Sequence, residues 1–253
     1  MELEGRAALV TGASRGVGRA TALALAQRGC AVAVNCSRSV AEGESVVEEI
    51  RRLGARATLV PADVADDAAC REMVGRAVSE LGRLDLVVNN AGTTRFIPHH
   101  DLDAVATEDF DRILAVNLRG PFQVTRAARS ALEEAGGEVV MVSSVAGVAG
   151  AGSSIPYCAS KGALNNLTLT LARALAPRVR VNAIAPGFIE GAWLRQGLGA
   201  AYEPVKRAME ERALLGRVCT PEEVAAAILA IVAGPDLVTG QILVVDGGML
   251  LGR

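Results

Sequence analysis

The chain has 253 residues, of which 51% are hydrophobic and 21% are charged, so it can bury a large core and does not have a disordered composition. A formal net charge of -2 argues against a broad basic surface for nucleic acid or an anionic membrane. No apolar run reaches the roughly 18 residues of a membrane helix. The first residues lack a signal-peptide pattern, and five scattered cysteines without C-x-x-C spacing predict neither a disulfide framework nor a metal site. These features predict a cytoplasmic protein.

The first elements are expected to be a strand, a glycine-rich turn and a helix. Residues 7–11 form an apolar run typical of a strand buried on both faces, and residues 19–28 form an Ala/Leu-rich helical segment. Between them stands Thr11-Gly12-Ala13-Ser14-Arg15-Gly16-Val17-Gly18. Its glycines let the backbone approach a phosphate at the positive end of the helix. A dinucleotide site is therefore predicted, although the spacing is G-x-x-x-G-x-G rather than G-x-G-x-x-G.

The residues after the second strand, expected at 31–36, bear on the choice of cofactor. An acid there would bind the ribose 2'-hydroxyl of NAD and repel a 2'-phosphate. The chain instead reads Asn35-Cys36-Ser37-Arg38-Ser39, with no acid before Glu42. Arg15 and Arg38 could together bind a 2'-phosphate through charge-assisted hydrogen bonds, which favours NADP(H) over NAD(H). The alternative is that both arginines are solvated surface charges.

Strands and helices continue to alternate in the middle of the chain. Helices are expected at 44–53 and 67–81, and strands at 57–60 and 84–88. Asp63 follows the third strand and could contact an adenine or cap the next helix. The fourth strand runs into Asn89-Asn90-Ala91-Gly92, a tight turn at a carboxyl end, where ligands of parallel sheets gather.

The segment 93–106 has no clear period and is expected to be a loop whose two histidines, His99 and His100, lie at the surface or contact substrate. A long helix should span 107–134 and include Asn117. A fifth strand is expected at 137–143.

A helix predicted at 156–176 carries the most reactive pair of side chains. Tyr157 and Lys161 are four residues apart, so the ammonium would lie beside the phenol and lower its pKa. Ser144, thirteen residues before Tyr157, could hold a substrate oxygen from the other side. Taken alone, such a pair could also be an exposed tyrosine and a solvated lysine.

The last third of the chain contains a sixth strand at 179–185, followed by Pro186-Gly187. Residues 188–217 are expected to be loosely structured and to form either a substrate lid or a surface excursion. A capping box at 220–223 predicts a helix through 232, and a seventh strand is expected at 241–246.

This alternation, without repeats or linkers, predicts a single α/β domain over 1–253. The expected fold is doubly wound and Rossmann-type, with about seven parallel strands and helices on both faces.

Six motifs resemble, in order and spacing, those of the short-chain dehydrogenase/reductases. They are Thr11-Gly12-x-x-x-Gly16-x-Gly18, Asn89-Asn90-Ala91-Gly92, Asn117, Ser144, Tyr157-x-x-x-Lys161 and Pro186-Gly187. The match covers essentially the full length. The resemblance implies hydride transfer between a nicotinamide cofactor and a small-molecule carbonyl or secondary alcohol, by a homotetramer.

The resemblance also implies individual roles. Tyr157 would be the general acid or base, Lys161 would lower its pKa and bind the nicotinamide ribose, and Ser144 would hold the substrate oxygen. Asn117 would support a water chain that leads from Lys161. The expected cofactor contacts come from the glycine turn and from the strand ends: Gly12, Ser14, Arg15, Gly16, Val17, Gly18, Ser37, Arg38, Asp63, Val64, Asn90, Ala91, Gly92, Tyr157, Lys161, Pro186, Gly187 and Ile189.

Within the family the chain looks most similar to the 3-oxoacyl-acyl-carrier-protein reductases, with two departures. Residues 133–138 are acidic, where those reductases carry basic residues that dock the acidic carrier, and Gly191 stands where the family often has Thr. The other alternative is a catalytically silent dinucleotide-binding protein. The presence of both Tyr157 and Lys161 disfavours it.

Overall fold

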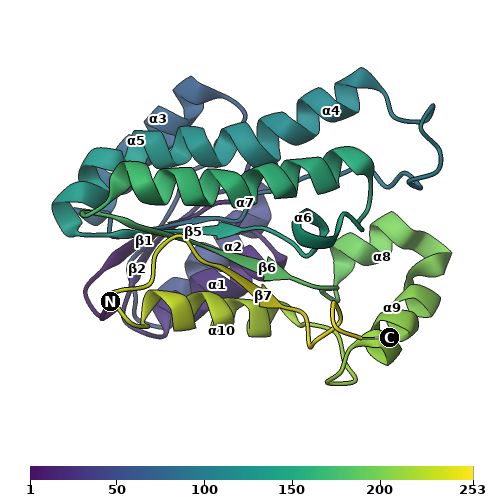
Figure 1. The fold of residues 1–253 in the computed structure, drawn as a ribbon. Helices are drawn as coiled ribbons and strands as arrows, with labels where there is room; N and C mark the ends of the chain where they lie inside the picture. The colour runs from purple at the N-terminus through teal and green to yellow at the C-terminus, as the bar shows by residue number, and fades with distance from the viewer. Residues whose placement is uncertain (253) are drawn as a thin grey trace.

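The computed structural model describes residues 1–252, which form one α/β domain around a seven-stranded parallel sheet (Figure 1). The strand order is β3-β2-β1-β4-β5-β6-β7, so the chain runs outward from β1 to β3 and then returns to the other side of β1. The predicted doubly wound fold is confirmed. The strands are β1 Ala7–Val10, β2 Ala31–Val34, β3 Ala57–Leu59, β4 Leu86–Asn89, β5 Glu138–Val142, β6 Arg180–Pro186 and β7 Ile242–Val245.

Helices cover both faces of the sheet. One face is covered by α3, α5 and α7, and the other by α1, α2 and α10 (Figure 1). Within residues 1–252, no helix combines the length and the apolar character needed to cross a membrane. The helices are α1 Gly16–Ala26, α2 Val40–Arg52, α3 Asp67–Leu81, α4 Thr107–Leu114, α5 Gly120–Ala135, α6 Ala146–Ala149, α7 Ile155–Leu175, α8 Ala192–Leu198, α9 Tyr202–Arg212 and α10 Pro221–Val232.

The apolar run of β1 shows why the strands lack polar alternation. Ala7 and Leu9 point into the core under α3, α5 and α7, whereas Ala8 and Val10 point into the core under α1, α2 and α10. All four side chains are fully buried. A strand in the middle of a two-sided sheet has no solvent face, so each of its positions favours an apolar residue.

The helix expected at 107–134 is interrupted by a π-helical turn, Ala115–Arg119, between α4 and α5. Pro121 has no amide hydrogen to donate to the carbonyl of Asn117, so the α-helical pattern cannot continue there. Gly120 packs directly on Val64, since an added Cβ would lie 2.8 Å from Val64 Cγ2. The π turn was not predicted, and Asn117 lies in its middle.

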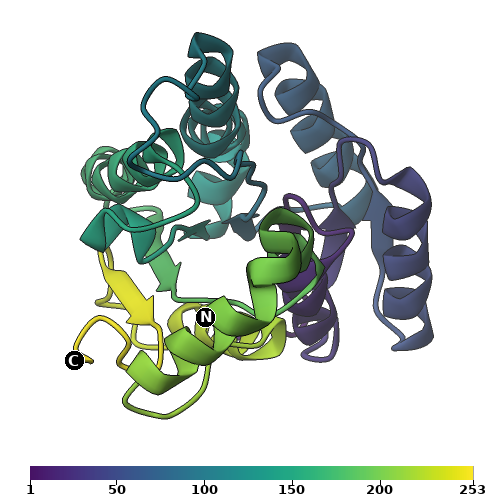
Figure 2. The ribbon, with the colours of Figure 1, turned by 90° about the vertical axis from the view of Figure 1, so that its right-hand side faces the viewer.

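The expectation that residues 188–217 are loosely structured is wrong. They contain α8, a short 3₁₀ turn at Gly199–Ala201, and α9. In Figure 2, α8 and α9 lie in front of the carboxyl ends of the strands. The short helix α6, directly before α7, was also not predicted.

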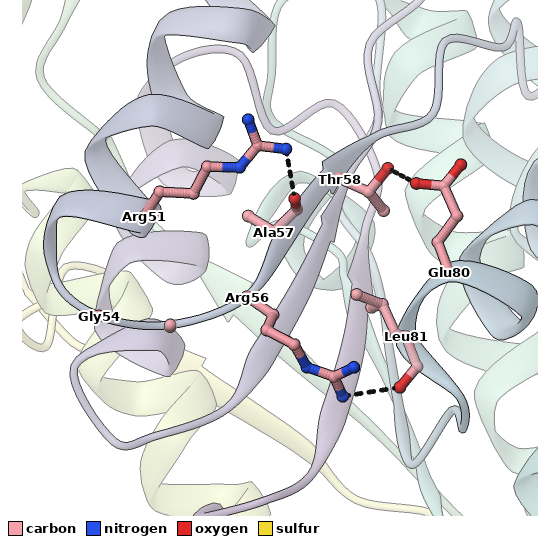
Figure 3. Close-up of a pocket in the computed structure, with 8 residues that line it drawn as sticks. Arg51, Gly54, Arg56, Ala57, Thr58, Glu80 and Leu81 are labelled. Carbon is pink, nitrogen blue, oxygen red and sulfur yellow. Dashed lines mark hydrogen bonds between the residues drawn. The ribbon is translucent and has the colours of Figure 1, made fainter.

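Arginine side chains cap the free edge of β3, at one side of the sheet. On its inner side, β3 forms backbone hydrogen bonds with Val32 and Val34 of β2. The carbonyls of Ala57 and Leu59 face outward, and they accept hydrogen bonds from Arg51 Nη2 at 3.0 Å and Arg76 Nη2 at 3.2 Å. Figure 3 shows the bond from Arg51 to Ala57, and both residues line a hollow beside this strand. The hollow lies at the amino end of β3, away from the strand ends that carry the predicted site.

Candidate active site

The predicted site residues gather at the carboxyl ends of the parallel strands. They come from the turn after β1, the segments that follow β2 to β6, the π turn and the first turns of α7. These ends meet where the strand order reverses, between β1 and β4, which is where open parallel sheets bind ligands.

The glycine turn is held in place from its inner side and open on its outer side. Asn90 Nδ2 donates to the carbonyls of Thr11 at 2.9 Å and Gly12 at 3.0 Å. A Cβ on Gly18 would lie 2.9 Å from Ala13 Cα, so only glycine fits beneath the turn. Gly16 has a φ of +55° and nothing within 4 Å of an added Cβ. The open side at the start of α1 therefore fits the phosphates of a dinucleotide.

Tyr157 and Lys161 are buried in the first turns of α7, where the predicted i and i+4 spacing places them together. Ser154 caps the helix by accepting a hydrogen bond from the Tyr157 amide. Lys161 Nζ lies 5.7 Å from the centre of the Tyr157 ring and donates to the carbonyl of Val142 at 2.7 Å. The alternative of an exposed tyrosine and a solvated lysine is wrong.

Burial controls the protonation of this pair. It raises the pKa of Tyr157 to about 12, against the opposite effect of a hydrogen bond with Ser144. It lowers the pKa of Lys161 to about 8. The lowered phenol pKa that the spacing predicts is therefore not found, because the loss of solvation outweighs the stabilisation of a phenolate. At neutral pH the phenol keeps its proton and Lys161 is mostly an ammonium.

Asn117 connects the turn after β4 to α7. Its Oδ1 accepts from the Thr93 amide at 2.8 Å, and its Nδ2 donates to the Thr93 carbonyl at 2.9 Å. The same Nδ2 donates to Ser160 Oγ at 3.0 Å, and that hydroxyl donates to the Tyr157 carbonyl at 2.7 Å. The fully buried Asn117 thus holds the segment after β4 against the turn of α7 that carries Tyr157 and Lys161.

Arg15, in the glycine turn, and Arg38, after the end of β2, are both exposed. Within residues 1–252, neither guanidinium forms a hydrogen bond or ion pair with a protein group. Ser37 is exposed beside Arg38, whereas Asn35 and Cys36 are buried. The first solvent-facing positions after β2 are therefore a hydroxyl and a cation.

Asp63 does not cap α3, because Asp66 does so by accepting from the Ala69 amide at 3.0 Å. Burial acts to raise the pKa of Asp63, but hydrogen bonds from the Ala65 amide and Arg112, with the charge of Arg38, hold it below its usual value. The carbonyl of Val64 accepts from Gln123 Nε2 at 2.8 Å. Both side-chain oxygens of Asp63 are thus engaged by the protein.

The end of β6 closes the site from the side of β7. The Pro186 carbonyl accepts from the Val145 amide, and the Gly187 amide donates to Val245 at 2.9 Å. Ile189 pairs with Cys219 in an isolated parallel bridge.

A family model described as enoyl-(acyl carrier protein) reductase matches residues 12–250. The crystal structure of a "putative short-chain dehydrogenase/reductase" from Burkholderia xenovorans superposes with a TM-score of 0.90 at 41% identity, and the match covers 98% of each chain.

The chain belongs to the short-chain dehydrogenase/reductase family. "Granaticin polyketide synthase putative ketoacyl reductase 2" of Streptomyces violaceoruber is 44% identical over 97% of this chain and 96% of the relative. The 3-oxoacyl-[acyl-carrier-protein] reductase FabG of Thermotoga maritima is 37% identical over 99% of this chain and 100% of the relative. As a short-chain dehydrogenase/reductase, the protein is an oxidoreductase that works with a nicotinamide cofactor.

Three buried polar residues that support this dehydrogenase/reductase site were not assigned a role from sequence. Thr11 Oγ1 accepts from the amides of Asn90 at 2.9 Å and Ala91 at 3.0 Å. Asn35 Oδ1 accepts from the Gly12 amide at 3.2 Å. Ser160 links Asn117 to α7. The role of Thr11 could have been predicted, because Thr11 belongs to the glycine-turn motif. The roles of Asn35 and Ser160 could not, because no sequence motif marks them.

The two histidines take different places in the segment after β4. His99 Nε2 lies 3.9 Å from the sulfur of Cys158, next to Tyr157, while His100 is exposed. The segment is also tied to the start of α7, since the Ile97 amide donates to the Ser153 carbonyl at 2.9 Å. It therefore lies beside the site.

Proposed function

We propose that the protein reduces the carbonyl group of a small or medium, mostly apolar substrate, with NADPH as the preferred cofactor. The observation that carries this proposal is the placement of Tyr157, Lys161 and Ser144 together in a buried site at the strand ends that also hold the open glycine turn.

Tyr157 is the proton donor. A bound nicotinamide supplies the hydride that the carbonyl carbon accepts. The hydroxyl of Tyr157 gives its proton to the carbonyl oxygen, and the Ser144 hydroxyl orients that oxygen. A phenol with its pKa raised to about 12 holds its proton at neutral pH, which suits the reductive direction. The Lys161 ammonium stabilises the phenolate left behind.

Asn117 acts on this chemistry as a positioning residue. Its bonds to Thr93 and Ser160 hold the turn after β4 against α7. A water chain from Lys161 past Asn117, which the family resemblance implies, is part of the proposal.

NADPH is preferred because Arg15 and Arg38 present two exposed guanidinium groups beside the glycine turn. Without protein partners within residues 1–252, both are free to bind a 2'-phosphate. Ser37 adds a hydroxyl at the same place. The contacts proposed for Gly12, Ser14, Gly16, Val17 and Gly18 are to the pyrophosphate.

Titration of NADPH and NADH tests the cofactor preference. We expect NADPH to bind the wild type at least tenfold more tightly, about 1.4 kcal/mol, and Arg38→Ala to remove most of that difference. Arg52→Ala, an exposed arginine at the end of α2, is the matched control. Equal binding of both cofactors to the wild type would overturn the preference for NADPH.

Reduction of a β-ketoacyl group is the more specific candidate. Support comes from the two relatives named as ketoacyl and 3-oxoacyl reductases. The acidic residues at 133–138 repel an acidic carrier protein less than the sequence indicates, because two of them are paired with arginines. Glu138 is buried and paired with Arg180 at 2.6 Å, and Glu133 is paired with Arg129 at 2.6 Å.

A homotetramer is the proposed assembly. The outer edge strand β7 exposes Leu243 (44%) and Val244 (38%), and Leu251 is 80% exposed beyond it. Burying such an apolar edge against a second copy would stabilise an oligomer. Sedimentation at micromolar concentration should give four copies, and a monomer would contradict the proposal.

Two further expectations stay proposals. The first is that residues 188–217 form a substrate lid, which would consist of α8 and α9. The other is a cytoplasmic location, which cell fractionation would test.

Turnover is the direct test of the proposed function. NADPH oxidation should be followed with ethyl acetoacetate, a small β-ketoester, and with 1-tetralone, a flat aryl ketone. We expect turnover of at least one of them by the wild type. Saturable binding of a dinucleotide without turnover of either ketone would instead favour the catalytically silent dinucleotide-binding protein.

A further inference from the structure

Aromatic residues are rare in this chain but gather around the site. The sequence has one Trp, two Tyr and four Phe. Five of these seven lie in the lid, in the segment that meets it, or at the proton donor: Phe96, Tyr157, Phe188, Trp193 and Tyr202. This concentration is a property of the site and not of the core, which is built from aliphatic side chains.

Trp193 contacts Tyr157 directly. The two rings meet edge to face, with centroids 6.3 Å apart and planes at 72°. Trp193 is nevertheless 48% exposed, so much of the indole surface remains open. A large apolar surface left open beside the proton donor is available to a substrate.

The helix that carries Trp193 is held by few contacts. Helix α8 buries none of its residues, and glycines flank it: Gly191 with a φ of +144° and Gly199 with a φ of +53°. On the other side it rests on Phe96, whose ring occupies the place that a Cβ on Gly197 would need. Apart from Arg195, which pairs with Glu203 and lies over the Tyr202 ring of α9, the position of α8 depends on Phe96 and on the contact of Trp193 with Tyr157.

Glu190 and Arg195, the charged residues on either side of Trp193 along the chain, are both paired within the lid. Glu190 Oε2 forms an ion pair with Lys206 Nζ at 3.0 Å, and Arg195 Nη1 forms one with Glu203 Oε1 at 2.7 Å. Polyol hydroxyl groups that lay against the exposed indole of Trp193 would lose water without gaining an unpaired charge from Glu190 or Arg195. A flat apolar group would instead cover the exposed indole.

We propose that Trp193 is the residue that selects the substrate, and that it favours a carbonyl joined to a flat apolar group, aryl or conjugated acyl, over a polyol. This inference rests on the proposed function, because it names the substrate class of the same site. Phe96 and Gly197 set the position of α8 and so act on selection through Trp193.

The kinetic test compares two ketones across four proteins. The values of kcat/KM for 1-tetralone and for ethyl acetoacetate are measured with NADPH for wild type, Trp193→Ala, Trp193→Phe and Leu237→Ala. We expect Trp193→Ala to lower kcat/KM at least tenfold more for 1-tetralone than for ethyl acetoacetate, and Trp193→Phe to recover most of that loss. Leu237→Ala is the control and should change neither value, because Leu237 is exposed and far from the lid helices in sequence.

A binding test does not depend on turnover, because Trp193 is the chain's single tryptophan. With NADP⁺ bound, 1-tetralone should quench its fluorescence saturably beyond the absorption effect seen with N-acetyltryptophanamide, whereas L-rhamnose should not. Equal losses for both ketones in Trp193→Ala, or no saturable quenching, would overturn the inference while leaving the proposed function intact. If neither ketone is turned over but quenching saturates, the proposed function fails and the assignment of Trp193 stands.

Discussion

The ammonium nitrogen of Lys161 lies 5.7 Å from the centre of the Tyr157 ring while it donates a hydrogen bond to the carbonyl of Val142. Both side chains are buried, and burial disfavours the charged form of each. A buried ammonium is thus kept beside a phenol that holds its proton. This relationship sets the pH range in which the pair can donate a proton.

The first prediction concerns that range. Burial lowers the pKa of Lys161 to about 8, so the ammonium form is present below pH 8 and is lost as the pH rises through this value. The kcat for ketone reduction should therefore be flat near pH 7 and fall above pH 8. Lys161→Met should be slower at every pH and should lack this fall. A fall of the same size in the Met variant would assign it to another group.

The second prediction separates positioning from chemistry at Asn117. Asn117→Ala leaves the half-buried amide and carbonyl of Thr93 without their side-chain partner, which costs about 1–3 kcal/mol in total. Both the free energy of unfolding in urea and kcat should fall. Ser160→Ala removes only the link to Tyr157 and should lower kcat with a smaller loss of stability. An Asn117→Ala protein with wild-type stability and kcat would contradict the role.

The third prediction concerns acid stability at the amino ends of the strands. Burial acts to raise the pKa of Asp85, but hydrogen bonds from Arg83, the Ala7 amide and Arg6 hold it below its usual value. A carboxyl with a lowered folded-state pKa stabilises the fold above about pH 4, and this contribution is lost as the pH falls through the folded-state value.

Asp85→Asn should therefore lower the free energy of unfolding at pH 7 by about 1–3 kcal/mol and should flatten its decline below pH 4. Asp67→Asn is the matched control, because its ion pairs with Arg71 and Arg126 are exposed. That change should cost much less than Asp85→Asn, because solvent screens exposed ion pairs. Equal effects of the two substitutions would show that burial of Asp85 does not matter.

The fourth prediction concerns the free edge of the sheet. Arg51 and Arg76 occupy the outward carbonyls of β3, which would otherwise be open to pairing with another strand. The double variant Arg51→Met and Arg76→Met should aggregate faster on mild heating, as measured by light scattering. Arg52→Met, at the exposed end of the same helix, should behave like wild type. Unchanged aggregation of the double variant would show that these caps are incidental.

Much of the fold follows from local pattern. Buried strands such as β1 are short apolar runs, and α10 is marked by a capping box whose reciprocal bonds join Thr220 and Glu223. The pairing of Tyr157 with Lys161 follows from helical spacing alone. These features depend on neighbours within a few residues, which is why the sequence reveals them.

The features that sequence could not reveal depend on distant neighbours. The contacts of Asn117 with Thr93 and Ser160 join segments far apart in the chain, and the pKa of Tyr157 reflects how completely the fold covers it. The lid helices are hidden because glycines such as Gly197, needed where Phe96 packs, lower the helical signal of that segment.

The most direct measurement compares wild type with Tyr157→Phe in two assays, NADPH binding and NADPH oxidation with the better of the two ketones. Loss of the proposed proton donor should lower kcat by about 10²-fold to 10⁴-fold while the dissociation constant for NADPH changes less than about threefold. A Tyr157→Phe enzyme that binds NADPH and reduces the ketone at the wild-type rate would contradict the assignment of Tyr157 as the proton donor.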